Sequence, residues 1–96
     1  MSANMGLVPT KACVAKIREA FPENAEVELI FMNDTCRNMP RGLRGYVIGV
    51  SDNGTIHVAW ESNLFLGAVW NADIVKNTKT GAYSNAFWND YQSVHC

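Results

Sequence analysis

The sequence predicts a mainly β domain with one N-terminal α-helix, a small antiparallel barrel and a C-terminal aromatic extension. The hydrophobic period is 3.6 residues at residues 10–21 and changes to two residues from position 26 onward. Turn-forming residues then separate the segments at short intervals. A chain of 96 residues fits one domain with a small core. We therefore expect a single domain over residues 1–96, which consists of a helix (about 10–21), a barrel (about 26–76) and a C-terminal extension (about 82–96).

An amphipathic helix is expected at residues 10–21. Its apolar positions recur at helical spacing and form one stripe, which contains Cys13, Val14, Ile17 and Phe21. Thr10 is suited to cap the first turn, because its hydroxyl can accept a backbone N–H. Pro22 cannot continue a helix and disfavours helical angles in the residue before it, so the helix ends there.

Four strands and a short fifth are predicted after the helix. They cover residues 26–31, 45–50, 55–60, 64–69 and 74–75. In the first three, alternation places apolar side chains on one face, as is typical of half-buried strands. These faces are Val27–Leu29–Phe31, Tyr46–Ile48–Val50 and Ile56–Val58–Trp60. The same alternation places His57 on the outer, solvated face of its strand.

Glycines mark the turns and one irregular position of this sheet. Asp52-Asn53-Gly54 lies between two strand patterns, and Gly54 can adopt the positive φ of a three-residue hairpin loop. Gly49, inside a strand pattern, predicts a β-bulge or a sharp bend. Strands this short leave unpaired edges, which an SH3-like barrel would cover. A split ferredoxin-like fold competes with it, but residues 33–42 are too short and too rich in helix breakers to supply its second helix.

The aromatic extension differs from the strands in its spacing. Tyr83, Phe87 and Tyr91 are four residues apart, and Trp88 lies beside them, so a helix would present one aromatic face. Phe87, Trp88 and Tyr91 are too apolar for a free terminus. We expect these three side chains to be buried against the barrel or in a homodimer contact.

Composition and spacing exclude several classes of function. The formal net charge is −1, so the chain lacks the excess of Lys and Arg that neutralises phosphates. Its three cysteines are odd in number and widely spaced, which does not indicate a disulfide framework. No nucleophile–base spacing, metal-ligand pair or phosphate-binding loop is present, so we expect no catalytic residue, metal or cofactor. Without a signal-peptide pattern or a membrane-length apolar run, we expect a cytoplasmic protein with no membrane partner.

Short motifs follow one another in a characteristic order over about half of the chain. They are Phe21-Pro22, Val27–Ile30, Met32–Asp34, Pro40–Gly42, Gly45–Val47, Gly49-Val50, Asp52–Val58 and Trp60. In order and spacing they resemble a small uncharacterised bacterial and phage domain family with an SH3-like barrel. The resemblance implies that fold, an origin in bacteria, phages or other mobile elements, and no established catalytic residue. Gly42–Val47 is more loosely similar to the Gly-x-x-Gly-x-Val element of KOW and Tudor-type barrels, which bind RNA or protein segments.

From these observations we expect the chain to be a non-catalytic binding module. The resemblance implies a phage or mobile-element accessory protein that engages a host protein in the host cytoplasm, with inhibition of a host defence system as one such role. The alternatives are a KOW-like nucleic-acid-binding module and a binder of a small nucleotide-like ligand at an oligomer interface. Arginine forks suit anionic groups, and large aromatics suit protein contacts. The predicted binding residues are Arg37, Arg41, Arg44, Trp70, Phe87, Trp88 and Tyr91.

Overall fold

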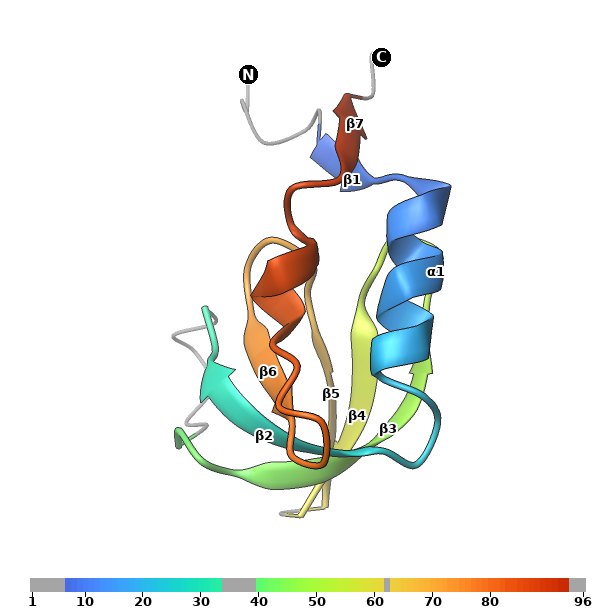
Figure 1. Cartoon of the computed structure of the whole chain (residues 1–96). Helices are drawn as coiled ribbons and strands as arrows, with labels where there is room; N and C mark the ends of the chain where they lie inside the picture. Colours follow the sequence, from blue (N-terminus) through green and yellow to red (C-terminus); the bar gives the residue numbers. More distant parts are fainter. Residues whose placement is uncertain (1–6, 34–39, 62, 94–96) are drawn as a thin grey trace.

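Two antiparallel sheets, one α-helix and a 3-10 helix make up the part of the chain that the computed structural model describes, residues 7–33, 40–61 and 63–93 (Figure 1). The larger sheet has the strand order β5-β4-β3-β2-β6, and the smaller one pairs β1 with β7. The elements are β1 (Leu7–Pro9), α1 (Lys11–Ala20), β2 (Glu26–Phe31), β3 (Arg44–Val50), β4 (Ile56–Trp60), β5 (Leu64–Ala68), β6 (Ile74–Asn77), the 3-10 helix η2 (Ser84–Phe87) and β7 (Tyr91–Ser93). The predicted mainly β class with one helix is confirmed.

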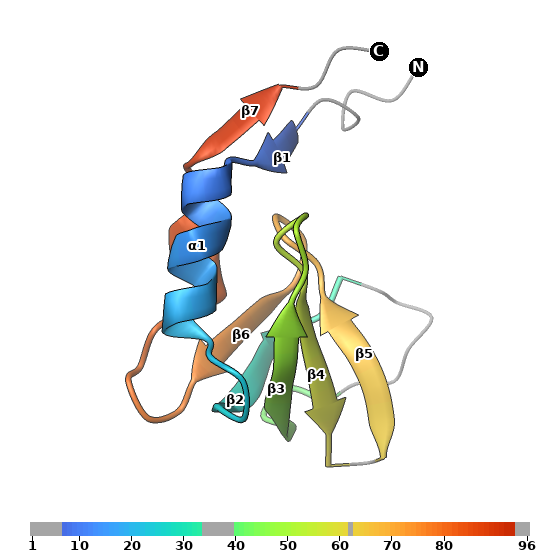
Figure 2. The same ribbon diagram turned by 90° about the vertical axis from the view of Figure 1, so that its right-hand side faces the viewer.

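Helix α1 begins and ends as its sequence predicts. The Thr10 hydroxyl accepts the backbone N–H of Cys13 at 3.0 Å, which satisfies one of the free donors of the first turn. At the other end the N–H of Phe21 donates to the carbonyl of Ile17 at 2.8 Å, and Pro22 follows. The apolar stripe is buried against the inner side of the curved sheet, where α1 and η2 lie side by side (Figures 1 and 2).

The β3–β4 hairpin forms at the predicted turn. Ser51 and Thr55 close the loop with a backbone hydrogen bond of 3.0 Å, and Gly54 has a φ of 82°. A side chain at Gly54 would also meet its surroundings, because a Cβ there would lie 3.0 Å from Pro9 Cγ and 3.2 Å from Trp70 Cβ. The predicted irregularity at Gly49 is confirmed as well, since the β3–β4 register shifts between Val47 and Gly49.

The inner face of the sheet differs from the simple alternation in two strands. In β2, Val27 and Leu29 are buried, but the register with β6 shifts before Phe31 and leaves that ring half-exposed. In β3, Tyr46 and Ile48 share a face as expected, and it is the outer one. The prediction that Val50 shares this face is wrong, because the shift at Gly49 places Val50 opposite the buried Ile56, against the core. Gly45 and Val47 are the buried residues of this strand. Position 45 has no room for a side chain, because a Cβ there would come within 2.6 Å of the Ala59 carbonyl oxygen. In β4 the buried face is the predicted Ile56, Val58 and Trp60.

The C-terminal extension does not form the helix expected across residues 83–91. It forms one turn of 3-10 helix, η2, and then pairs as β7 with β1. Polar residues with low helix propensity (Asn85, Asn89 and Asp90) interrupt the aromatic spacing, and tertiary hydrogen bonds fix the alternative path. The backbone N–H of Val75 donates to Ser84 Oγ at 2.9 Å, and the backbone N–H of Thr10 donates to the carbonyl of Asp90 at 3.3 Å.

The extension packs on the rest of the domain through its aromatic rings. Phe87 and Trp88 are half-buried and lie against the core cluster. The rings of Phe87 and Phe21 meet edge to face, with centroids 6.5 Å apart and planes at 76°. Two donors, Cys13 Sγ at 3.0 Å and Trp70 Nε1 at 3.2 Å, converge on the carbonyl oxygen of Phe87. Tyr91, in contrast, is 51% exposed, so the expected burial against the larger sheet is wrong for this residue, because β7 pairs with β1 in the separate two-stranded sheet.

Replacing Gly54 by alanine is expected to lower the free energy of unfolding more than replacing Gly81. Both glycines have φ near 80°, so each variant has a backbone cost of about 1–3 kcal/mol. Only at Gly54 does a Cβ also press on Pro9 and Trp70, because nothing lies within 4 Å of a Cβ at Gly81. Urea unfolding of the two variants measures the difference. Equal losses would show that the hairpin loop does not pack as described.

Candidate interaction surface

A strip of aromatic side chains crosses the outer face of the larger sheet. Tyr46 in β3 pairs with Ala59 in β4, and Ala59 pairs with Phe65 in β5, so the three side chains form one row. Tyr46 is 57% exposed and Phe65 is 73% exposed. Two strand spacings place their backbones about 10 Å apart. The small Ala59 side chain lies between the two large ones in this row. We call the row of three residues the Tyr46–Phe65 strip.

Close strand packing directs this strip outward. Gly45 fits between β3 and β4 only without a side chain, which places Tyr46 and Ile48 on the solvent side. Ile48 is itself 47% exposed and extends the apolar surface along β3. Gly67, two residues after Phe65, lies against Thr55, because a Cβ there would come within 2.6 Å of Thr55 Cγ2. The outer face of β3–β5 thus combines large rings with positions that have little or no side chain.

Charged residues of alternating sign border the strip on the same sheet. Lys76 in β6 pairs with Glu28 in β2, and Glu28 pairs with Arg44 in β3. The Arg44 guanidinium lies 3.9 Å from the Glu26 carboxylate, and the backbone N–H of Arg44 donates to Glu61 Oε1 at 3.2 Å. Arg44 therefore has a carboxylate beside it, and the Lys76 ammonium group lies over the Tyr83 ring, 5.6 Å from its centroid. Within the described residues, this face offers no continuous basic track for a phosphate backbone.

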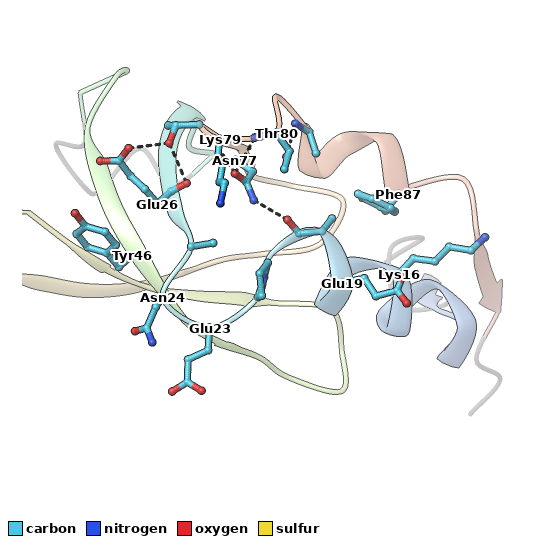
Figure 3. Close-up of a pocket in the computed structure, with 15 residues that line it drawn as sticks. Lys16, Glu19, Glu23, Asn24, Glu26, Tyr46, Asn77, Lys79, Thr80 and Phe87 are labelled. Carbon is cyan, nitrogen blue, oxygen red and sulfur yellow. Dashed lines mark hydrogen bonds between the residues drawn. The ribbon is translucent and has the colours of Figure 1, made fainter.

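A groove with a volume of about 890 Å³ lies beside the strip (Figure 3). It separates the end of α1 and the segment after it from the turn that follows β6. Figure 3 shows Tyr46 and Glu26 at one end of this groove and Lys16 and Phe87 at the other. Its charged lining residues carry both signs: Lys16, Glu19, Glu23, Glu26 and Lys79.

Asn77 holds the two sides of the groove together. Its side-chain Nδ2 donates to the carbonyl of Ala20 at the end of α1, at 2.8 Å. Its Oδ1 accepts the backbone N–H groups of Lys79 at 2.9 Å and Thr80 at 3.2 Å. Asn77 is 3% exposed, and all of these bonds satisfy groups that the fold removes from water. Its role in the described structure is to position the groove.

Two of the three predicted arginines, Arg41 and Arg44, lie at or just before the start of β3. Arg37 lies outside the described residues. Arg41 is exposed in the turn before β3, and Arg44 projects from the outer face of that strand. Arg44 and Tyr46 are two residues apart on one strand, so the structure brings a predicted binding residue next to the aromatic strip.

The predicted aromatic residues lie elsewhere. Trp70 is buried, and Phe87 and Trp88 are half-buried against the inner core, where the structure brings the three together. Tyr91 is separate from them and lies on the β1–β7 ribbon. The predicted set is thus divided between the outer face of the sheet, the inner core and the ribbon.

Sequence reasoning did not single out Tyr46 or Phe65 as binding residues. Both lie in strands whose two faces carry apolar side chains, Arg44–Val50 and Leu64–Ala68. Alternation alone cannot assign the outer face in such strands. The usable signal is the spacing Gly45-Tyr46-Val47, because a glycine at a core-facing position indicates a close strand approach and leaves its neighbour outside.

Chemically reactive groups are scattered in the described residues. Cys13 is buried on α1, where burial raises the pKa of its thiol and the Asp90 carboxylate acts in the same direction. His57 is exposed on the outer face of β4. Within residues 7–33, 40–61 and 63–93, no three His, Cys, Asp or Glu side chains are grouped closely enough to hold a metal ion. In the same ranges, no helix has the length and apolar character needed to cross a bilayer.

The sequence comparison gives one family. Residues 10–78 match the model of a family described as a domain of unknown function, DUF4314. The match covers α1 and all of the strands of the larger sheet, and it leaves β1, η2 and β7 outside. No curated protein and no solved structure matches the chain.

Replacing Asn77 by alanine is expected to lower the free energy of unfolding by about 1–3 kcal/mol. The variant leaves the carbonyl of Ala20 and the two N–H groups of the following turn without their partner. Lys79→Ala is the matched control in the same turn, and its effect is expected within about 0.5 kcal/mol. Chemical denaturation measures both. A loss for Asn77→Ala no greater than the control would contradict the bridging role.

The Cys13 thiol is expected to make stability fall at alkaline pH. Its pKa is raised in the folded chain, so the unfolded chain releases the proton first as the pH rises. The stabilisation is therefore complete below the thiol's ordinary pKa and is lost as the pH passes the raised one. Urea unfolding between pH ~8 and ~10 measures this, in a chain with Cys36→Ser and Cys96→Ser. Adding Cys13→Ala should make the decline shallower, and identical slopes would refute the assignment.

Proposed function

The chain belongs to the DUF4314 family, whose description assigns no activity, and from its geometry we propose that it is a non-catalytic module that binds another protein through the Tyr46–Phe65 strip. The single observation that supports this proposal is the exposure of two large rings in one cross-strand row. Exposed aromatic surface of this kind is favourable to bury and supplies much of the binding energy in protein interfaces.

A protein partner fits this face better than a nucleic acid. Single-stranded nucleic acids also stack on exposed rings, but their phosphates need uncompensated cations along the same surface. Here Arg44 lies beside Glu26 and opposite Glu28, and Lys76 lies opposite Glu28 in the β2–β6 register with its ammonium group over the Tyr83 ring. A polar rim of mixed sign around an apolar centre is the usual anatomy of a protein–protein interface. The nucleic-acid alternative depends on Arg37, Arg41 and Arg44, and of these Arg44 has the Glu26 carboxylate beside it.

We also propose that the fold is an SH3-like barrel and that the chain comes from a phage or another mobile element. In the larger sheet β2 lies between β3 and β6, and the sheet is strongly curved, which supports an SH3-like barrel that is open between β5 and β6 in the described residues (Figures 1 and 2). The resemblance noted in the sequence supports a phage or mobile-element protein that acts on a host protein in the cytoplasm. Inhibition of a host defence system is one activity of that kind. The partner's identity decides between these roles.

Replacing Phe65 or Tyr46 by serine is expected to remove the partner while the fold persists. Both side chains are exposed, so little packing is lost. The tagged chain is used to capture partners from extracts of a bacterial host, and the affinity of the purified partner is then measured by calorimetry. Each serine variant should weaken binding by about tenfold or more, as expected for hot-spot aromatics.

Tyr91→Ser is the matched control, because it removes a ring of similar exposure from the β1–β7 ribbon. It should retain the partner. If the Phe65→Ser and Tyr46→Ser variants still bind the partner, the proposed surface is wrong. If only Tyr91→Ser loses the partner, the interface lies on the β1–β7 ribbon. A nuclease-sensitive partner would favour the nucleic-acid alternative.

A further inference from the structure

The two edge strands of the larger sheet, β6 and β5, differ in the hydrogen bonds that cover them. The edge strand β6 is covered by residues that follow it: the N–H of Asn77 donates to the carbonyl of Ala82 at 2.8 Å, and the N–H of Val75 donates to Ser84 Oγ at 2.9 Å. The other edge, β5, pairs with β4 on one side and with no further strand among the described residues (Figure 2). Within the described part of the chain, one edge is therefore closed by the protein itself, and the other has room for a partner strand.

Strand β5 lacks the features that usually protect an edge. Its residues, Leu64–Ala68, include no charge and no proline, and Phe65 is the most exposed large hydrophobic side chain described. The inward-facing Leu64 and Leu66 are only half-buried, whereas Val58 on neighbouring β4 is fully buried. The core is therefore incompletely covered along this edge.

We propose that β5 pairs with β5 of a second copy of this chain, antiparallel and about a two-fold axis at Leu66. Full overlap of two five-residue strands requires Leu66 to lie opposite itself. Leu64 then lies opposite Ala68, and Phe65 lies opposite Gly67 of the second copy. In this register the backbone groups of Phe65 and Gly67, which point away from β4, form the new ladder, whereas the carbonyl of Leu66 points toward β4 and accepts Trp60 Nε1 at 3.0 Å.

This register is self-complementary on both faces of the sheet. On the outer face, Gly67 presents only backbone, and a side chain there is excluded because a Cβ would lie 2.6 Å from Thr55 Cγ2. The Phe65 ring of the second copy covers that position, as aromatic rings do for glycines opposite them in sheets. On the inner face, the half-buried Leu66 side chains bury each other. No like charges meet, since β5 has none. A strand of unrelated sequence would supply the hydrogen bonds without this match.

Disulfide cross-linking tests the register directly. In a chain with Cys36→Ser and Cys96→Ser, Leu66→Cys places two thiols opposite each other, at a Cα separation of about 4.5–5.5 Å that a disulfide can bridge. Mild oxidation should then give a covalent dimer on a non-reducing gel. Phe65→Cys is the matched control: its two copies are diagonal, at about 7–8 Å, and should remain monomeric. Preferential cross-linking of Phe65→Cys would overturn the proposed register.

Sedimentation of the unmodified chain tests the association itself. The expected result is a concentration-dependent dimer that Phe65→Lys weakens by about tenfold or more, because it removes the ring that covers Gly67. Tyr91→Lys, on the ribbon, should leave the dimer unchanged. A monomer at every concentration, or a dimer indifferent to Phe65→Lys, would overturn the proposal. Leu66→Cys retains Tyr46 and Phe65, so loss of cross-linking there is distinguishable from loss of the proposed protein partner.

Discussion

The carbonyl oxygen of Phe87 is where three distant parts of the chain are joined. It accepts Cys13 Sγ from α1 and Trp70 Nε1 from the turn after β5. Buried polar groups are costly unless they are paired, so two donors and one acceptor hold η2 in a single position. In that position the Phe87 ring reaches Phe21 and covers the core on the side that the curved sheet leaves open.

This junction also determines which surface is available for binding. Helix α1 and the extension occupy the inner side of the larger sheet, and residues 82–84 cover the edge of β6 (Figure 1). The outer face of β3–β5 and the edge of β5 remain, and both carry Phe65. The two proposals therefore concern adjoining surfaces of the same strand. The first proposal places side chains of another protein on the outer face of β5, and the second places the backbone of a second copy at its edge.

Local features of the fold were predictable because their causes lie within a few residues. The α1 boundaries follow from the Thr10 hydroxyl and from Pro22, and the hairpin follows from the positive φ available to Gly54. The irregularity at Gly49 is of the same kind. The candidate surface was predicted only in part. Arg44 was identified, but Tyr46 was noted only as one member of an apolar face, since alternation shows that two faces exist without showing which one meets the core.

By itself, the sequence determined the helix, the hairpin, the five strands of the larger sheet and the apolar character of the extension, because propensity, capping and turn chemistry act locally. Only the tertiary structure decided the path of the extension and the orientation of β3. Tyr83, Phe87 and Tyr91 have helical spacing, yet Phe87 is held by Cys13 and Trp70, residues 74 and 17 positions away along the chain. Such partners are brought together by burial of the whole core, and contacts of this kind outweigh the weak local preference for a helix.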